Sequence, residues 1–304
     1  GRNPFTLAAA GWSLFRGIRQ SRALMTRLRP RAIVGFGGYP TVPPMLAASA
    51  AGIPAVIHDA NAVMGRANRM VARTAQIIAM GFAAATRHDR AVVTGNPVRP
   101  AVIAAARTAY PLRQAGDPFH LLVFGGSQGA RYFAEVVPAA LERLDPSRRA
   151  LIRLVQQARP EDDDEVTAQL AGLGVEAQVS PFFTDMAERI AAAHLVISRA
   201  GASTVSELAV IGRPALLVPY PHALDHDQAM NARAMAEAGG AEIVAQRDLD
   251  PARLASLIDS AIGEPDRLTA MAAVARCTGM PDAAERLAAC VEQVMAPDNR
   301  IGTG

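Results

Sequence analysis

Short apolar runs alternate with amphipathic stretches along the chain, and this pattern predicts strands joined by helices. The first part of the chain has predicted strands at residues 32–34, 54–57, 76–80 and 91–93. Its predicted helices cover residues 5–29, 45–51 and 66–74. Strands that are apolar on both sides and separated by helices are typical of a parallel sheet covered on both faces.

Residues 100–118 are rich in Pro, Gly and polar residues, and we interpret them as a connector. After this connector the pattern starts again, with strands predicted at residues 120–124, 151–155, 175–179, 195–198, 215–218 and 242–244. The last predicted helices cover residues 251–262, 266–277 and 282–294. We therefore expect an α/β fold of two Rossmann-like, doubly wound parallel-sheet domains that face each other across a cleft.

The composition limits the class of protein. The chain has 304 residues, 50% of them hydrophobic, which is enough for two α/β domains. No uninterrupted apolar run is long enough to span a membrane, and its two cysteines, Cys277 and Cys290, do not suggest a disulfide framework. The acidic run at residues 161–165 lies where a helix should begin, and the helix dipole explains it better than a metal site does. No metal or other cofactor is expected.

Charge is distributed unevenly along the chain. Residues 1–58 contain seven arginines and neither Asp nor Glu, which indicates an anionic partner such as nucleic acid, phosphate or a membrane surface. Aromatic residues are few, and the sequence has no recognition-helix or RNA-binding signature. We therefore expect no nucleic acid partner.

The first predicted helix carries apolar and basic residues at helical spacing. Its apolar members are Trp12, Phe15 and Ile18, and its basic members are Arg16, Arg19 and Arg22. One interpretation is a helix that packs its apolar stripe on a sheet. The other is an interfacial patch that inserts aromatic and aliphatic side chains into an anionic bilayer. The spacing alone does not separate these interpretations.

The segment 195–208 combines a strand, a small-residue turn and a helix start. The apolar run 195–197 ends at a turn containing Gly201, and a helix then opens at Ala202. The first N–H groups of a helix have no internal partner, and the helix dipole favours negative charge there, so this turn is a candidate anion site. Glu207, one turn further on, can accept hydrogen bonds from sugar or ribose hydroxyls. The alternative is a plain helix start with Ser203 as its N-cap.

Two further turns follow predicted strands of the same sheet. Residues 125–129 (GGSQG) let the backbone approach a ligand closely, and Ser127 can donate to a phosphate oxygen. This turn is neither a Walker loop nor a dinucleotide fingerprint. The loop 219–228 contains Asp225 and Gln228, which suit sugar hydroxyls, although a solvated loop with an Asp cap is the alternative. Ligands of open α/β sheets bind at this carboxyl edge.

His58 and Asp59 end a predicted strand in the first half of the chain. They therefore point toward the expected cleft. They could perform acid–base chemistry or cap the next turn. The sequence contains no nucleophile elbow and no paired Cys/His metal spacing that would favour another chemistry.

Seven segments, taken in order, resemble a known family. They are residues 35–39 (GFGGY), 58–61 (HDAN), 95–99 (GNPVR), 125–130 (GGSQGA), 182–186 (FFTDM), 199–207 (RAGASTVSE) and 225–228 (DHDQ). The chain resembles the MurG family of bacterial glycosyltransferases, within glycosyltransferase family 28, over nearly its whole length. The resemblance implies the GT-B fold. Residues 1–99 would form an acceptor and membrane-side domain, residues 100–279 a UDP-N-acetylglucosamine domain, and residues 280–296 a helix that crosses back.

The resemblance also implies residue roles at a donor site. The residues expected to contact ribose and phosphates are Ala202, Ser203, Thr204, Val205, Ser206 and Glu207, with Glu207 on the ribose hydroxyls. Ser127 would hold a phosphate, while Arg99 and the backbone of Phe183 would frame the uracil. Gln228, Asp225 and Asn61 would face the N-acetylglucosamine. No metal or cofactor is implied.

The implied activity is an inverting hexosyl transfer in peptidoglycan synthesis. N-acetylglucosamine would move from UDP-N-acetylglucosamine to the 4-hydroxyl of the N-acetylmuramic acid of lipid I, giving lipid II. The helix with Trp12, Phe15, Ile18, Arg16 and Arg19 would then contact the anionic membrane surface. The resemblance places such an enzyme peripherally on the cytoplasmic face of the bacterial inner membrane.

Two departures from the family pattern change these expectations. Asp59-Ala60-Asn61-Ala62 replaces the more usual Glu-Gln-Asn-Gly, which weakens the case for Asp59 as a catalytic group. The family's first strand and its Gly-Gly-x-Gly-Gly-His loop, whose histidine is the favoured general base, are not in this sequence. A chain shortened at its N-terminus, with little transferase activity, is therefore expected, and the catalytic base stays unassigned, with His58 and Asp59 as candidates. The alternatives are a UDP-N-acetylglucosamine 2-epimerase and a non-catalytic UDP-sugar-binding remnant.

Overall fold

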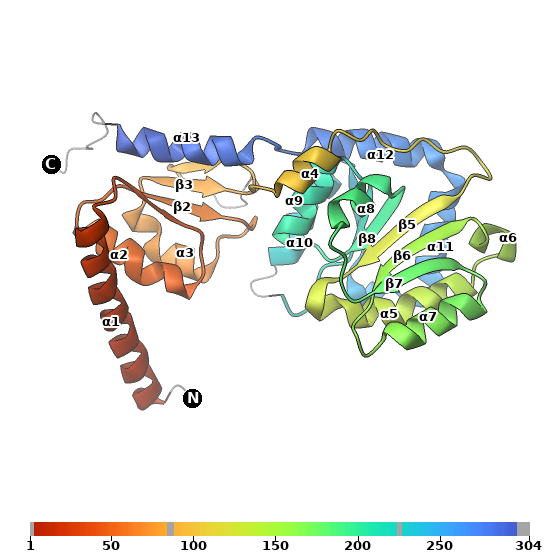
Figure 1. Cartoon of the computed structure of the whole chain (residues 1–304), viewed down its shortest axis with the longest axis horizontal. Coiled ribbons are helices and arrows are strands. Elements are labelled where there is room, and N and C mark those ends of the chain that lie inside the picture. Colours follow the sequence, from red (N-terminus) through yellow and green to blue (C-terminus); the bar gives the residue numbers. More distant parts are fainter. Residues whose placement is uncertain (1–2, 84–87, 224–226, 297–304) are drawn as a thin grey trace. The chain divides into compact units, whose positions relative to one another are not determined.

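The computed structural model of the chain describes residues 3–83, 88–223 and 227–296, without the side chains of residues 4, 5, 7 and 126–130. Contacts within the chain divide it into two compact units. Unit 1 comprises Gly1–Pro97 with Asp282–Gly304, and unit 2 comprises Val98–Pro281, against expected divisions after residues 99 and 279. Each unit is built on one parallel sheet with helices packed against it (Figure 1). The predicted α/β fold class is confirmed.

Unit 1 contains a four-stranded sheet in the order β1-β2-β3-β4, with all neighbours parallel. Its strands are β1 (Ile33–Gly35), β2 (Ala55–Asp59), β3 (Ile77–Met80) and β4 (Ala91–Val93). Its helices are α1 (Pro4–Leu28), η1 (Tyr39–Thr41), α2 (Val42–Ala50), α3 (Arg66–Val71), η2 (Ala72–Thr74) and α13 (Ala283–Met295). Every element predicted for this part of the chain is present, with boundaries within a few residues.

Alternating residues along the strands of unit 1 face two different helical layers. Val56, Ile77 and Ala79 pack with residues of α13, including Leu287 and Cys290. The opposite face of β2 packs instead with α2 and α3. Figure 1 shows α13, in blue, running along β3 and β2. The sheet therefore needs the C-terminal helix of the chain to cover one of its faces.

Helix α1 packs on α2 through a close approach at Gly17. A Cβ atom at Gly17 would lie 3.0 Å from the Pro43 side chain, so a larger residue there would push the two helices apart. Further along α1, Ile18 and Met25 pack against Ala47 of α2. This half of α1 thus belongs to the core of unit 1.

Unit 2 contains a six-stranded sheet in the order β10-β9-β8-β5-β6-β7, again parallel throughout. Its strands are β5 (Phe119–Phe124), β6 (Ile152–Gln157), β7 (Glu176–Ser180), β8 (Leu195–Ser198), β9 (Ala215–Leu217) and β10 (Ala241–Ile243). Its longer helices are α5 (Gly126–Glu142), α7 (Asp163–Gly172), α9 (Ala202–Ile211), α10 (Asp227–Glu237), α11 (Pro251–Gly263) and α12 (Pro265–Cys277). Short helices α6 (Pro146–Arg149), α8 (Met186–Ala192) and η4 (Gln246–Asp248) complete it.

One prediction about unit 2 was wrong. The interval 100–118, expected to be a connector, begins with helix α4 (Pro100–Ala105). Pro100 at the first helical position has a fixed φ angle suited to a helix start, and Val102 and Ala105 are buried. The helix packs on α8 and α9. Proline content alone therefore misled the interpretation.

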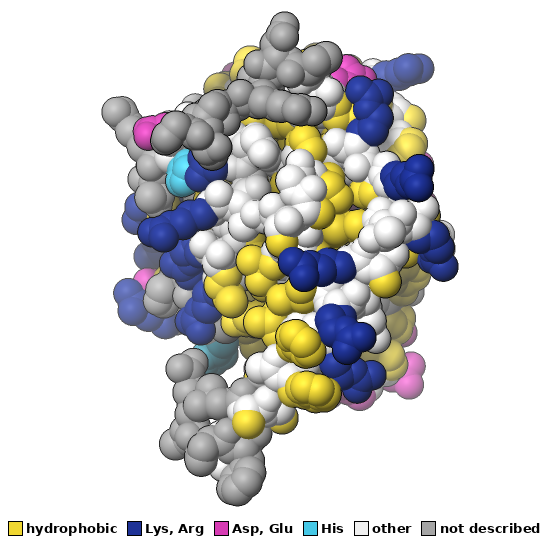
Figure 2. All heavy atoms as spheres, turned by 90° about the vertical axis from the view of Figure 1, so that its left-hand side faces the viewer, with side chains coloured by type: hydrophobic (Ala, Val, Ile, Leu, Met, Phe, Trp, Pro, Cys, Tyr) yellow, Lys and Arg dark blue, Asp and Glu magenta, His cyan; other side chains and the backbone are white. Residues whose placement is uncertain are grey.

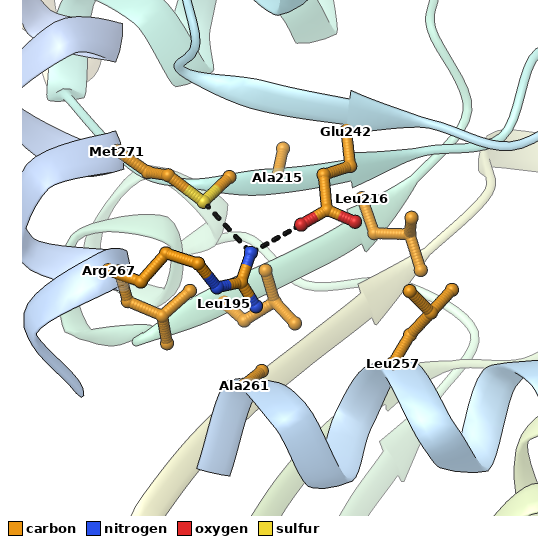
Figure 3. Close-up of a pocket in the computed structure, with 9 residues that line it drawn as sticks. Leu195, Ala215, Leu216, Glu242, Leu257, Ala261, Arg267 and Met271 are labelled. Atoms are coloured by element: carbon orange, nitrogen blue, oxygen red, sulfur yellow. Dashed lines mark hydrogen bonds and ion pairs between the residues drawn. The ribbon is translucent and has the colours of Figure 1, made fainter. Parts of the chain in front are cut away.

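Ion pairs fasten the edge of the unit 2 sheet to its helices. The guanidinium of Arg267, on α12, pairs with Glu242 on β10 and also with Glu264. Figure 3 shows Arg267 reaching across a small pocket toward Glu242, with the Met271 sulfur on its other side. The pocket has room for about one water molecule, so we regard it as a packing defect and not as a ligand site.

The described residues contain no group of three or more His, Cys, Asp or Glu side chains placed to hold a metal ion. The acidic residues Asp163, Asp164 and Glu165 lie in the first turn of α7, as their position in the sequence suggested. Among the helices that the structure describes, none is long and apolar enough to cross a membrane.

Candidate functional site

The strand order of unit 2 reverses between β5 and β8. Strands β6 and β7 follow β5 on one side, while β8, β9 and β10 extend the sheet on the other. The register pairs Phe124 with Ser198, so both strands end at the same level. The loops that leave them diverge to opposite faces, and ligands of open α/β sheets bind at such a switch point. Two of the glycine turns identified in the sequence, 125–129 and 199–204, lie here.

Helix α9 begins directly after β8, with Gly201 as its N-cap residue. The Gly201 backbone is extended, at φ −62° and ψ 147°, and no side chain caps the helix. The alternative prediction of Ser203 as N-cap is therefore wrong, because Ser203 already lies within the helix. The first internal bond runs from the Val205 N–H to the Gly201 carbonyl, at 3.0 Å. The amides of Ala202, Ser203 and Thr204 precede it, and the first turn has no acidic residue. This end of α9 thus favours an anion.

Two residues predicted to contact the donor turn their side chains into the protein. Val205 and Ser206 are buried, at 1% and 8% exposure, whereas Ser203 is exposed. Any contact that Val205 makes with a ligand would therefore be through its backbone.

The turn after β5 is tighter than the sequence indicated. Gly125 is the N-cap of α5, and the helix already begins at Gly126. Ser127 lies in the first turn of this helix, where its amide faces the same edge as the start of α9. The side chains of residues 126–130 lie outside the described part of the chain. The predicted contact of Ser127 with a phosphate therefore stays a prediction.

Glu207 lies on α9, and its carboxylate forms an ion pair with the guanidinium of Arg99. Arg99 Nε lies 3.2 Å from Oε1, and Nη2 lies 3.2 Å from Oε2. The sequence predicted both residues as donor contacts but did not predict that they touch. Arg99 is the N-cap residue of α4, and α4 packs on α9, which brings the two side chains together.

Gln228 joins two of the predicted turns through its side-chain carbonyl. Its Oε1 accepts hydrogen bonds from the Ala200 N–H, at 3.2 Å, and from the Tyr220 N–H, at 2.9 Å. Buried Asn231, one turn later on α10, donates to the Ala200 carbonyl at 3.3 Å. Helix α10 therefore fixes the turn after β8 and the loop after β9 relative to each other. Asp225 lies outside the described residues.

Arg199 is a site residue whose role the sequence did not reveal. Its guanidinium is enclosed by the rings of Tyr132, Phe133 and Tyr220, at 5.1–5.5 Å from their centroids. It donates to the Val218 carbonyl at 3.1 Å and to Gln246 Oε1 at 2.7 Å. Burial lowers the pKa of this guanidinium. The sequence contains one signal for this role, namely that an arginine directly follows an apolar strand. The charge of such an arginine is stabilised by contacts with aromatic rings or carbonyl oxygens.

Phe183 lies in the loop between β7 and α8. Its ring is buried, at 6% exposure, beneath the guanidinium of Arg189 at 4.2 Å, while neighbouring Phe182 is 73% exposed. The ring of Phe183 thus anchors the loop. Because the ring is buried, only the backbone of Phe183 is available to contact a base, which is the contact expected from the sequence.

In unit 1, the carboxylate of Asp59 is surrounded by donors. Its Oδ1 accepts from the Asn61 N–H at 3.1 Å, and its Oδ2 accepts from the Gly65 N–H and from the Asn68 amide, both at 2.8 Å. Asp59 is buried, at 3% exposure. Of the two roles considered from the sequence, this geometry favours capping of the turn. The predicted contact of Asn61 with the donor sugar stays a prediction.

His58 is equally buried and equally engaged. Its Nε2 lies 3.1 Å from the Gly95 carbonyl oxygen, which identifies Nε2 as the protonated nitrogen, and its ring lies against Phe36 at 5.7 Å. His58 therefore ties the end of β2 to the segment after β4. Neither candidate base presents a free side chain to solvent.

The amphipathic face of α1 divides into two parts. Trp12 and Phe15 stack on each other at 5.8 Å and are 63% and 50% exposed. Arg16 and Arg19 are exposed beside them, whereas Ile18 is half-buried against the α2 core. Figure 2 shows apolar surface on this side of unit 1 with Arg side chains along its margin. The packing of Ile18 fits the interpretation of a helix on the core, and the bilayer contact of the exposed part stays a prediction.

Comparison with known proteins identifies the family. The model of the glycosyltransferase family 28 C-terminal domain matches residues 120–287, and that of the family 28 N-terminal domain matches residues 3–80. A UDP-N-acetylglucosamine–N-acetylmuramyl-(pentapeptide) pyrophosphoryl-undecaprenol N-acetylglucosamine transferase from Sinorhizobium fredii is 57% identical, over 96% of this chain and 79% of the relative. Its counterpart from Agrobacterium fabrum is 55% identical, over 96% and 78%.

Solved structures agree with these relatives. The structure of Acinetobacter baumannii MurG matches with a TM-score of 0.80 and 31% identity, over 93% of this chain and 80% of that one. A putative UDP-N-acetylglucosamine 2-epimerase from Listeria monocytogenes matches with a TM-score of 0.67 over 92% and 78%, but at 15% identity this likeness concerns the fold alone. The chain belongs to the MurG family of glycosyltransferase family 28 and has its GT-B fold.

Proposed function

We propose that this protein is an inverting hexosyltransferase of peptidoglycan synthesis. It transfers N-acetylglucosamine from UDP-N-acetylglucosamine to the 4-hydroxyl of the N-acetylmuramic acid of lipid I, which gives lipid II. The observation that carries the proposal is the switch point of unit 2. There, strands β5 and β8 end at one level, and the uncapped start of α9 lies about one turn from Glu207. A diphosphate and the adjoining ribose match this arrangement.

The donor is held mainly by backbone groups in this proposal. The amides at the start of α9, from Ala202 to Thr204, and those at the start of α5 bind the diphosphate oxygens. Glu207 accepts hydrogen bonds from the ribose hydroxyls, and Arg99 and the Phe183 backbone frame the uracil. The side-chain amide nitrogen of Gln228 turns toward the sugar, because its oxygen is already used by two backbone N–H groups.

The chemistry follows from where charge develops. The acceptor 4-hydroxyl oxygen forms a bond to C1 of N-acetylglucosamine from the face opposite the diphosphate, while the bond between C1 and the phosphate oxygen breaks. The electron pair of that bond leaves with UDP, and the hydroxyl proton passes to a general base. Amides already oriented at the diphosphate stabilise the leaving charge without reorganisation, which often provides the largest part of a rate enhancement.

His58 and Asp59 fit a positioning role better than proton transfer. The Asp59 carboxylate accepts three hydrogen bonds from the segment 61–68, and that hydrogen bonding favours a fixed loop over a proton acceptor. His58 donates to a backbone carbonyl and is 3% exposed. We therefore assign neither residue as the base.

A lipid-linked acceptor requires contact with a membrane surface. The exposed pair Trp12 and Phe15 supplies an apolar contact, and Arg16 and Arg19 supply charge for anionic headgroups. We propose that α1 brings the enzyme to the cytoplasmic face of the bacterial inner membrane as a peripheral protein. The proposed partners are thus UDP-N-acetylglucosamine, lipid I and an anionic lipid surface.

The test is an assay of the purified enzyme with UDP-N-acetylglucosamine and a soluble lipid I analogue. The expected result is release of UDP that depends on the acceptor, with a product heavier by one N-acetylglucosamine and a new β linkage. Formation of the 2-epimer of the donor without acceptor would instead identify an epimerase. Binding of UDP-N-acetylglucosamine without any turnover would favour the binding remnant.

A further inference from the structure

Unit 2 has an open groove of about 420 Å³ at the amino end of its central strands. One wall comes from the segment that leads into β5, and the other comes from the end of α8. His120, in β5, and His194, directly before β8, complete the lining. The turns 125–129 and 199–204 follow the carboxyl ends of the same two strands. The groove therefore lies at the sheet edge opposite the proposed donor site.

The wall that leads into β5 is apolar and is held in one conformation. Pro111, Leu112 and Pro118 line the groove there, and Leu112 is 79% exposed. The turn between them is closed by two hydrogen bonds. The Asp117 N–H donates to the Gln114 carbonyl at 3.2 Å, and the Gln114 N–H donates to Asp117 Oδ2 at 2.8 Å. Two alanines of α8 form the facing wall. A wall that is already fixed loses little conformational entropy when a ligand binds.

The groove contains a hydrogen-bond donor on a buried ring. His194 lines the groove although it is 5% exposed. Its Nδ1 accepts from the His120 N–H at 2.9 Å, so the proton of the neutral ring is on Nε2. Nε2 has no hydrogen-bond partner among the described residues, and unlike Arg113 Nη2 it is not fully enclosed. Burial lowers the pKa of His194 to about 4, which keeps the ring neutral. The protein thus leaves one oriented N–H group unused.

The charges that line the groove balance each other. Arg113 and Asp117 are the two charged residues of its lining. Arg113 Nε donates to the Asp117 carbonyl at 3.1 Å, Nη1 donates to the Ile262 carbonyl at 2.7 Å, and Nη2 is enclosed. Asp117 Oδ1, in contrast, accepts no hydrogen bond from any described residue. The groove therefore offers a neutral donor and an acceptor, and its guanidinium is not available to an anion.

We propose that this groove binds an uncharged, extended peptide segment of another protein. A carbonyl oxygen of the segment accepts from His194 Nε2, and an N–H group of the segment donates to Asp117. An apolar side chain of the segment lies on Leu112 and the two prolines beside it. An extended peptide carries both backbone groups and can place alternate side chains in such a groove.

Other ligand classes match the groove less well. A carboxylate would lie beside the charge of Asp117, and no free guanidinium would compensate it. An acyl chain would cover the His194 N–H and leave it without a partner, which costs free energy. The balance of charge, donor and acceptor therefore favours a peptide over an anion or a lipid.

The test follows the histidine rings of the whole protein by NMR after selective labelling of histidine with ¹⁵N. The probe is N-acetyl-leucine N′-methylamide, which has two peptide bonds around one apolar side chain. We expect a saturable shift of the His194 Nε2 signal, with a dissociation constant on the order of millimolar for so small a ligand. His222, which does not line the groove, should not shift. His194→Asn identifies the signal. No shift at His194 would overturn the proposal.

Two related probes and a dilution series separate other occupants. N-acetylglycine N′-methylamide lacks the apolar side chain and should bind about tenfold more weakly. Isovalerate, an apolar carboxylate, should also bind about tenfold more weakly. Equal affinity for isovalerate would identify an anion site. A His194 signal that moves with protein concentration alone would identify a second copy of the chain as the occupant. Either result would overturn the proposal.

Matched variants locate the binding. Ala192→Phe fills the groove from an exposed alanine, and Leu112→Ala removes the apolar contact. Each should weaken binding of the leucine probe at least about fivefold. Ala168→Phe and Leu28→Ala make the same changes at exposed positions outside the groove and should have no effect. Thermal midpoints close to that of the wild type verify folding. Unchanged affinity in either groove variant, or an equal loss in its control, would overturn the proposal.

Discussion

Arg99 and Glu207 form a two-point ion pair that joins the entry of the chain into unit 2 to helix α9. Arg99 follows Val98, the first residue of unit 2, and its side chain is 59% exposed, whereas that of Glu207 is 14% exposed. Both carboxylate oxygens of Glu207 are engaged, each at 3.2 Å. Ribose hydroxyls that bind Glu207 must therefore share or replace the contacts with Arg99. In the proposed donor site, donor binding and the conformation of this chain entry are linked through one carboxylate.

The first prediction separates the contributions of Glu207 and Arg99 to donor binding. Glu207→Ala should weaken UDP-N-acetylglucosamine binding by about 1.5–3 kcal/mol, since it removes a charged hydrogen-bond acceptor. Arg99→Gln should change the free energy of unfolding by less than about 1 kcal/mol, because the arginine is largely exposed. Calorimetry should also show that Arg99→Gln lowers donor affinity less in the Glu207→Ala background than in the wild-type background, and the effect that remains measures the proposed contact of Arg99 with the uracil.

A second exposed ion pair provides the control for this double-mutant comparison. Arg148 and Asp259 lie 3.3 Å apart in unit 2, with both side chains about half exposed. Arg148→Gln and Asp259→Asn should leave donor affinity unchanged. If Glu207→Ala binds UDP-N-acetylglucosamine as tightly as the wild type, the ribose assignment is wrong and Glu207 serves only the ion pair.

The second prediction concerns membrane contact through α1. Trp12→Asp with Phe15→Asp should reduce co-sedimentation with anionic vesicles, and added salt should weaken binding of the wild type. Ile18 is unsuitable for this test because it packs against the core of unit 1. Leu112→Asp, which changes a 79% exposed leucine of unit 2, is the matched control and should bind normally. Equal pelleting with neutral and anionic vesicles at every salt concentration would contradict a role for charge.

The third prediction uses a glycine that lies against α9 just before the chain leaves unit 2. A Cβ atom at Gly279 would come within 2.6 Å of the Ala209 carbonyl oxygen. Gly279→Ala should therefore lower the free energy of unfolding by about 1–3 kcal/mol. It should also weaken donor binding, because a displaced α9 carries Glu207 with it. Denaturant unfolding and donor calorimetry measure the two effects.

Gly172 provides a matched control for that substitution. It ends helix α7, and a Cβ atom there would have no neighbour within 4 Å. Gly172→Ala should be neutral or stabilising by up to about 1 kcal/mol. A similar loss of stability in both variants would mean that the contact with Ala209 is not the cause.

The sequence predicted the order of strands and helices well, because the apolar runs of a two-sided parallel sheet are a strong local signal. The strand 195–198, for instance, was predicted with the bounds it has in β8. Helix α4 was missed, since its Pro100 was interpreted as a feature of a connector and not as a helix start. Local patterns were therefore most reliable where burial and periodicity agreed.

The sequence was less informative about contacts within the site. Gln228 was selected for its sugar-binding chemistry, yet its carbonyl oxygen holds two turns together. Arg199 was part of the segment 195–208, but its partners come from α5 and from residues 218–246, which no local pattern connects. Such roles depend on tertiary distances. The positions of the turns at one sheet edge, by contrast, follow from parallel topology and could be anticipated.

The fourth prediction concerns Arg213, which is fully buried and has no carboxylate partner among the described residues. Its guanidinium donates to the backbone carbonyls of Thr108, Ala109, Ala191, Ile211 and Gly212. Burial lowers the pKa of Arg213 to about 10, so it stays charged at neutral pH. Arg213→Met should lower the free energy of unfolding by about 3–5 kcal/mol, because several buried carbonyls lose their donor. Arg247→Met, at a largely exposed position, should change it little. Similar unfolding midpoints for both variants would contradict this role.

The last prediction concerns the pH dependence of stability and rests on His194. Its Nδ1 accepts a hydrogen bond from the His120 N–H at 2.9 Å, and its ring stacks on Phe119. Burial, aided by the charges of His120, Arg113 and Arg213 and opposed by Asp117, lowers the pKa of His194 to about 4. The unfolded chain therefore binds a proton between about pH 6.5 and pH 4 that the folded protein excludes.

It follows that the contribution of His194 to stability is complete above about pH 6.5 and is lost as the pH falls toward 4. The loss at the acid end should reach about 3 kcal/mol. His194→Asn keeps an acceptor for the His120 N–H and removes the titrating ring, so its stability should fall less between pH 7 and pH 4.5, as measured by urea unfolding at several pH values. His222→Asn, at an exposed histidine, should retain the wild-type slope. If His194→Asn loses as much stability on acidification as the wild type, the buried ring is not what makes the fold acid-sensitive, and carboxylates paired in the native state must account for it.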